Sequence, residues 1–251
     1  MIKKDYSVLA LIFFITRTFF NLYNFNNLLN YLIINIIILV SIFIMKKHNI
    51  KTNNIFYLSL IFIIYIIVLV ITSNFINNNY FKYNNNFVII ITLLVLSYLI
   101  GKEKLGVISS LSEILFFIFF ISTIIIYIGL FSQINIVNYK HYININNIII
   151  NYMPLLLIIV FMYLKSENIL TGYIIGSISV LLDNILLVGV LGTKLILTYK
   201  YPAISILKSL SFLNFLNHLD KIFSLSYLFE YTITLSLLIN IIINIKKKLK
   251  T

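Results

Sequence analysis

The chain has 251 residues, of which 61% are hydrophobic and 10% are charged, and its mean hydropathy is +1.04. Soluble globular proteins are about half apolar and about a quarter charged, so this composition excludes a soluble globule and indicates an integral membrane protein. The formal charge is +12 and cysteine is absent, which excludes disulfides and thiolate metal or redox chemistry. The lysines are scattered among apolar runs and form no single stripe, so the basic charge does not indicate a nucleic-acid partner.

Apolar runs of about 17 to 25 residues are long enough to cross a bilayer as helices. Eight such runs predict an all-α, polytopic bundle that forms one integral membrane domain over residues 1–251. They lie near residues 7–23, 28–45, 55–76, 86–101, 106–131, 147–164, 170–197 and 222–245. The first run follows two lysines but ends without a small-residue cleavage site, so we expect a retained span and not a removed signal peptide.

Lysine placement predicts the orientation, because lysine and arginine accumulate in cytoplasmic loops. With both termini cytoplasmic, twelve lysines lie inside and six lie outside. The inner set is Lys3, Lys4, Lys46, Lys47, Lys51, Lys102, Lys104, Lys165, Lys246, Lys247, Lys248 and Lys250, and the outer set is Lys82, Lys140, Lys194, Lys200, Lys208 and Lys221. Anionic lipid of the inner leaflet is the partner that this inner charge predicts.

Four ionisable residues fall inside the predicted spans, where a central charge costs about 2.5 to 3.5 kcal/mol and is a functional candidate by default. Arg17 shares a face of the first span with Asn21, and we expect it to pair with an intramembrane acid. Asp183 lies near the middle of the seventh span and should face protein or a water cavity. Glu230 lies in the eighth span, and Glu113 lies about two turns into the fifth, where it can snorkel. The alternative for each is interhelical hydrogen bonding alone, worth about 0.6 kcal/mol on average.

Small residues precede Asp183 at helical spacing. Gly172, Gly176 and Ser179 lie on the same face of the seventh span as the acid. Small residues spaced by three or four let two membrane helices approach closely, so this face predicts a tight helix contact that carries Asp183 with it. We expect packing and not gating to be the main role of the two glycines.

The connection over residues 189–230 is the longest one that carries polar residues. After Tyr201 and Pro202, apolar residues recur at helical spacing over residues 203–216, with polar residues between them. This pattern predicts an amphipathic surface helix within an extracellular segment, residues 198–221. Proline biases the preceding residue away from helix, so the helix should begin at or just after Pro202. Its apolar face should bury itself at the outer mouth of the bundle.

The glycines, the Tyr-Pro pair, the amphipathic helix and the sequence FLNHLDKIF before a span together resemble the permease-like B subunits of spore germination receptors. These are relatives of the amino acid/polyamine transporters. A second pattern, SYLIG followed by KEKLGVISSLSEILFFIFFI, resembles the family's tyrosine, glycine, charged turn and start of the fifth helix. The matching residues are Tyr98, Gly101, Glu113 and Ile114. Ser110 and His218 stand where that family usually has arginine, so the partner charges of Glu113 and Asp220 are missing from their expected places.

The resemblance covers roughly residues 7–245 and implies the first eight helices of a ten-helix fold with a five-plus-five inverted repeat. In that fold the first and sixth helices are unwound at mid-membrane and hold the substrate. Here the first span lacks the glycine break, and the sixth offers Asn151 and Pro154. We therefore assign to substrate binding Arg17, Asn21, Asn151, Asp183 and Glu230, and to structure or gating Glu113, Gly172, Gly176, Tyr201, Pro202 and Asp220.

The function that the resemblance implies is a non-enzymatic, permease-like subunit without a cofactor. It would bind a small polar germinant such as an amino acid and signal, either in place of transport or in addition to it. Its partners would be membrane lipid and the other germinant-receptor subunits, in the bacterial cell membrane or the spore inner membrane.

Two alternatives remain open. One is a polytopic membrane enzyme or glycan-handling protein with a catalytic outer loop, which would need convergent acids, arginines or histidines over residues 194–221. That loop offers His218, Asp220 and lysines, and the chain has no HExxH pair and no serine elbow. The other is a degenerate paralogue of the permease family.

Overall fold

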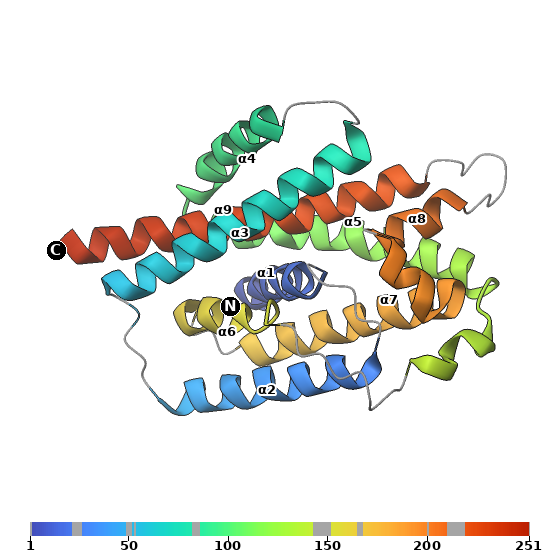
Figure 1. The fold of residues 1–251 in the computed structure, drawn as a ribbon. Helices are drawn as coiled ribbons and strands as arrows, with labels where there is room; N and C mark the ends of the chain where they lie inside the picture. Colours follow the sequence, from blue (N-terminus) through green and yellow to red (C-terminus); the bar gives the residue numbers. More distant parts are fainter. Residues whose placement is uncertain are drawn as a thin grey trace.

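The structure, a computed structural model, describes residues 2–21, 27–48, 52, 54–81, 86–142, 152–164, 168–199, 201–209 and 219–250. Throughout these residues the regular structure is helical, and they contain no strand, as the apolar runs predict. The elements are α1 (Ile2–Asn21), α2 (Leu28–Lys47), α3 (Ile55–Tyr80), α4 (Asn86–Gly101), α5 (Leu105–Phe131), the 3-10 helix η1 (Ile136–His141), α6 (Leu156–Leu164), α7 (Ile169–Thr198), α8 (Pro202–Ser209) and α9 (Leu219–Lys250). Figure 1 shows their arrangement.

Five of these helices, α2, α3, α5, α7 and α9, are long and apolar enough to cross a membrane. α3, for example, has 26 residues, so it is about 39 Å long, which exceeds the roughly 30 Å of a bilayer's hydrocarbon core. The outer faces of these helices expose large apolar side chains such as Phe43, Phe117 and Phe131. Length and exposed apolar surface together indicate an integral membrane protein. α4 and the apolar part of α1 (Tyr6–Asn21) are shorter apolar helices. The predicted sixth span is described over residues 152–164, of which α6 is the helical part, with nine residues.

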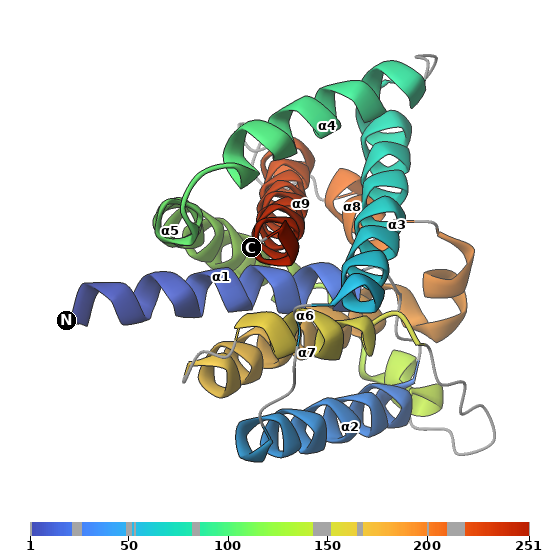
Figure 2. The same ribbon diagram turned by 90° about the vertical axis from the view of Figure 1, so that its left-hand side faces the viewer.

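α1 is the central helix of the bundle. Every residue from 10 to 20 is at most 3% exposed, so this part of the helix is covered on all sides. It packs against α5, α6, α7 and α9. Figure 2 shows α1 lying between α5 and α9 above it and α6 and α7 below it, and running crosswise to α9. A helix that is buried all round needs partners for each of its polar side chains, so its single arginine has to find them inside the bundle.

The remaining helices form two groups around α1. α9 packs against α3, α4 and α5, while α2 packs against α6 and α7 on the other side of α1 (Figures 1 and 2). The amide of Asn240 in α9 donates to the carbonyl oxygens of Gly101 and Glu103, at 2.9 and 2.7 Å, and so fixes the end of α4 to α9. Both of the longest helices, α7 and α9, contact α1, which places their polar residues beside Arg17.

α7 covers the predicted seventh span, residues 170–197, and contains a break within it. Gly192 has φ 77° and ψ 158°, a conformation essentially confined to glycine, so the helix is interrupted there before it continues to Thr198. η1 satisfies the carbonyl groups that the break frees. The Asn138 amide donates to the carbonyl oxygens of Gly189 and Val190, at 2.7 and 3.3 Å. The Tyr139 hydroxyl also donates to the carbonyl oxygen of Ile185, one turn before Gly189, at 3.0 Å. The resemblance places helix breaks in the first and sixth helices, whereas α1 is continuous and this break lies in α7.

α8 begins at Pro202, as the proline predicts, and Tyr199 before it has extended backbone. The predicted amphipathic helix reaches residue 216, but residues 210–218 lie outside the described part of the chain, so α8 is its described portion. α8 packs against α7 and α9, with Pro202 and Ile206 buried. The apolar face of the segment therefore covers the bundle.

Candidate functional site

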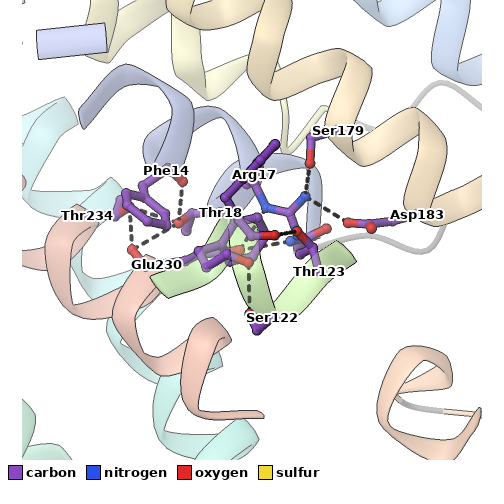
Figure 3. A network of polar contacts seen from close by, with 12 residues as sticks. Phe14, Arg17, Thr18, Ser122, Thr123, Ser179, Asp183, Glu230 and Thr234 are labelled. Atoms are coloured by element: carbon purple, nitrogen blue, oxygen red, sulfur yellow. Dashed lines mark hydrogen bonds and ion pairs between the residues drawn. The ribbon is translucent and has the colours of Figure 1, made fainter. Parts of the chain in front are cut away.

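Arg17 of α1 lies at the centre of a buried ion network. Its side chain is 0% exposed, and it contacts carboxylates from two other helices. Nε donates to Oε1 of Glu230 in α9 at 2.7 Å, and Nη1 lies 2.7 Å from Oδ2 of Asp183 in α7. Figure 3 shows the guanidinium group between the two acids. The pairing of Asp183 with Arg17 inside the bundle confirms the expectation that an intramembrane acid and this arginine meet.

Glu230 is fully engaged by α1. Its second oxygen, Oε2, accepts from the Asn21 amide at 3.0 Å, so the face shared by Arg17 and Asn21 binds both oxygens of one carboxylate. The Thr18 hydroxyl contacts the Glu230 carbonyl oxygen at 3.1 Å and the Thr234 hydroxyl at 2.8 Å (Figure 3). These bonds fix the register of α9 against α1 at the level of the ion network.

Asp183 is held by α5 and α1. The Tyr127 hydroxyl of α5 donates to Asp183 Oδ1 at 2.5 Å, and Arg17 Nη1 donates to the Ser179 hydroxyl, one turn before Asp183, at 2.5 Å. Asp183 Oδ2 and Arg17 Nη2 are buried polar atoms that take no aligned hydrogen bond within the described part of the chain, although Oδ2 is in ionic contact with Nη1. Asp183 Oδ2 therefore has the ionic contact without an aligned hydrogen bond, whereas each oxygen of Glu230 accepts one hydrogen bond from α1.

Phe119 of α5 covers the arginine from another direction. The Arg17 Cζ atom lies 4.3 Å from the centroid of the Phe119 ring, and it lies 5.7 Å from that of Phe13. Cations are attracted to the face of an aromatic ring at such distances, and the attraction grows when water is excluded. The arginine is thus stabilised by two acids and by aromatic rings, and all of these are buried.

The small-residue face of α7 brings Asp183 to α1, as its spacing predicts. A Cβ atom on Gly172 would lie 2.8 Å from Ile12 Cβ, and one on Gly176 would lie 2.8 Å from Thr16 Cβ. Both distances are shorter than real side chains allow, so glycine is what permits α7 to approach α1 so closely. The Gly172 and Gly176 face therefore packs directly on the residues that precede Arg17.

A cavity lies beside Asp183, next to the start of α8. Its lining residues are Asn21, Phe75, Asp183, Asn184, Leu187, Tyr201, Pro202, Ala203, Tyr227 and Tyr231. The space open to water centres is about 40 Å³, which suits about three waters, since one water needs roughly 10 to 15 Å³. A second cavity of about 20 Å³, lined by Tyr127 among others, also borders Asp183. Among the described residues of both linings, Asp183 is the charged one.

The other residues assigned from the sequence fall in three places. Tyr201 and Pro202 line the larger cavity, and burial raises the pKa of the Tyr201 hydroxyl, so this group stays neutral. Glu113 is half-buried in α5 and lies 14 positions before Tyr127, about 21 Å along the helix, so it does not belong to the network. Asn151 lies outside the described residues, and Asp220 lies near the start of α9, where only the backbone is described.

Apart from Tyr201, sequence reasoning missed the aromatic residues of the site. Tyr127 is the tyrosine of α5 and follows the apolar run over residues 124–126, and a buried tyrosine hydroxyl usually has a hydrogen-bond partner. Phe75, Tyr227 and Tyr231 gave no comparable signal, because the chain contains 21 Phe and 18 Tyr residues and most of them face lipid or neighbouring helices in any bundle.

Within the described residues, no group of three or more His, Asp or Glu side chains could hold a metal ion. Of the outer loop on which a catalytic alternative would depend, His218 lies outside the described residues and the Asp220 side chain is not described. Comparisons of the chain with family models, with curated proteins and with solved structures found no match.

Proposed function

We propose that this chain is a permease-like integral membrane protein that binds a small polar ligand, such as an amino acid, beside the Arg17, Asp183 and Glu230 network. The observation that carries the proposal is the fully buried Arg17 joined to acids of two other helices, with a cavity open beside one of them. Apolar side chains of similar volume often replace a buried ion pair at no loss of stability. Three charges at membrane depth are therefore better explained by binding than by packing.

The two acids differ in their hydrogen bonds and in their access to a cavity, and this difference supports a ligand site at Asp183. Both oxygens of Glu230 accept hydrogen bonds from α1, whereas Asp183 lines two cavities and its Oδ2 accepts no aligned hydrogen bond from the described residues. A polar ligand in the larger cavity would reach Asp183 without breaking the Arg17 to Glu230 contact. The bundle would then keep its central ion pair in both the empty and the bound state.

The family assignment within this proposal is a germinant-receptor B subunit, and it rests on the resemblance of residues 189–230 and of the SYLIG segment. Pro202 and Ala203 of α8 line the cavity, which supports a role for α8 as the segment that covers the ligand site. The subunit would lie in the bacterial cell membrane or the spore inner membrane, with eight crossings and both termini cytoplasmic. It would act with the other receptor subunits, by signalling or by transport.

Ligand binding can be tested on the full chain in lipid nanodiscs. Equilibrium binding of radiolabelled glycine and alanine should be saturable and should be lost in Asp183→Asn. Glu113→Gln removes an acid from a span outside the network and is the matched control, which should bind as the wild type does. Absence of saturable binding for every proteinogenic amino acid would contradict the proposal.

The receptor assignment needs a separate test in the source organism. Deletion of the gene should abolish the response of spores to at least one germinant, and the neighbouring genes should encode the other receptor subunits. An organism that forms no spores would refute the assignment, while the binding site could still stand.

A further inference from the structure

We infer that the cavity beside Asp183 recognises the ammonium group of its ligand, so that a small amine cation binds there without needing a carboxylate. This inference rests on the proposed function, because it takes the cavity to be the ligand site. It narrows the ligand class from small polar molecules to organic ammonium ions. Three features of the cavity carry it: the net charge of the network, the acceptors in the lining and the aromatic rings.

The network is short of positive charge. Arg17 supplies one positive charge and is shared between Asp183 and Glu230, so the formal charges of the three side chains sum to −1. An uncompensated negative charge is costly in a buried, low-dielectric site. Arg17 is absent from the lining of the cavity, whereas Asp183 lines it. A ligand in the cavity therefore meets the acid and not the guanidinium group, and a cationic ligand restores neutrality.

The amides that line the cavity also present acceptors. Asn184 Nδ2 donates to the Val180 carbonyl oxygen at 2.9 Å, and Asn21 Nδ2 donates to Glu230 Oε2 at 3.0 Å. A carbonyl oxygen and a carboxylate can only accept, so each amide has to turn its nitrogen toward the protein. The oxygen of each amide is an acceptor on a residue that lines the cavity. Together with Asp183 they suit the three N–H donors of a primary ammonium group.

Four aromatic rings complete the lining. Phe75 of α3 packs against Tyr201, Tyr227 and Tyr231, with ring centroids 5.2, 5.8 and 5.5 Å away. All four rings line the cavity, from α3, from the residue before α8 and from α9. Aromatic faces beside a carboxylate attract organic ammonium ions, which are less strongly hydrated than metal cations. An anion would find a carboxylate and electron-rich rings here.

The size of the cavity limits the bound group. Its space for about three waters accommodates roughly three or four non-hydrogen atoms. Ethylammonium has three such atoms and is therefore a suitable probe, with acetate as the anion of similar size. A larger ligand would place its amino end here and extend past Tyr201 and Pro202.

The test is isothermal titration calorimetry of the full chain in nanodiscs with four ligands. These are ethylammonium chloride, potassium acetate, glycine and sodium chloride. Ethylammonium should bind, while acetate and sodium should not. Binding of acetate, or of sodium in place of ethylammonium, would overturn the inference. Binding of glycine without ethylammonium would overturn it and leave the proposed function intact, whereas failure of every amine and amino acid would remove both.

Variants of residues that line the cavity test whether ethylammonium binds there. Asp183→Asn should weaken ethylammonium binding at least about tenfold, because it removes the charge partner of the ammonium group. Tyr201 is only half-buried, so its variants should fold even if Asp183→Asn does not. Tyr201→Leu should weaken binding about three- to tenfold, whereas Tyr201→Phe keeps the ring and should stay within about twofold of wild type. Glu113→Gln is the control that should bind normally. Wild-type affinity in Tyr201→Leu would argue against the aromatic cavity.

Discussion

Arg17 of α1 and Asp183 of α7 lie 2.7 Å apart, between Nη1 and Oδ2, in a bundle where the arginine is fully buried. The pair joins the central helix to the helix that carries the small-residue face. A second acid, Glu230, binds the same guanidinium group from α9, so one arginine fixes three helices relative to one another.

Removal of the arginine should destabilise the protein strongly. Arg17→Gln leaves two buried carboxylates without a cation, and breaking a buried pair in this way costs about 3 to 5 kcal/mol. The triple variant Arg17→Gln, Asp183→Asn, Glu230→Gln removes the charges together and should recover much of the lost stability. Unfolding of the purified proteins in detergent checks this. Equal stability of the single and triple variants would show that the charges are not coupled.

Gly176→Ala should separate α7 from α1. The added Cβ would lie 2.8 Å from Thr16 Cβ, so the helices have to move apart, at a cost of about 1 to 3 kcal/mol. Because Arg17 follows Thr16 directly, the Arg17 to Asp183 contact should weaken too. Gly106→Ala is the control, since nothing lies within 4 Å of its Cβ position. Thermal unfolding midpoints should fall for the first variant alone.

Gly192→Ala should be destabilising for a different reason, because alanine would be strained in the backbone conformation of this position. Its φ of 77° and ψ of 158° are strained for any residue with a Cβ, at a cost of about 1 to 3 kcal/mol. The Cβ would also lie 3.2 Å from the Asn138 side-chain oxygen. We expect a lower unfolding midpoint with the Arg17 network unchanged. An unchanged midpoint would mean that α7 runs through this position without a break.

Single cysteines can test the topology cleanly, because the chain has no cysteine of its own. Lys47→Cys, Lys102→Cys and Lys247→Cys should be protected from an impermeant thiol reagent in intact cells, whereas Lys194→Cys should be labelled. All four lysines are exposed in the structure, so protection would reflect the membrane and not burial. External labelling at Lys247 together with protection at Lys194 would reverse the predicted orientation.

The sequence by itself determined the helical class and most helix positions, because apolar runs long enough to cross a bilayer leave no other regular structure that satisfies the backbone in lipid. It also determined which residues had to be buried and paired. Arg17, Asp183 and Glu230 stand out in an apolar chain because a charge at that depth needs a partner. Pro202 likewise determined where α8 begins, since proline acts on its own neighbours.

Only the tertiary structure decided which of these residues meet and what surrounds them. Helical periodicity assigns a residue to a face of its own helix, but it does not say which helix packs on that face. It therefore left open that Arg17 binds both acids, that Tyr127 holds Asp183, and that Phe75 brings three tyrosines to the cavity. The break at Gly192 could not be predicted from the sequence for a related reason. The carbonyl groups that the break frees, those of Gly189 and Val190, accept from Asn138 of η1, about 50 residues earlier in the chain, and the sequence around Gly192 does not indicate such a partner.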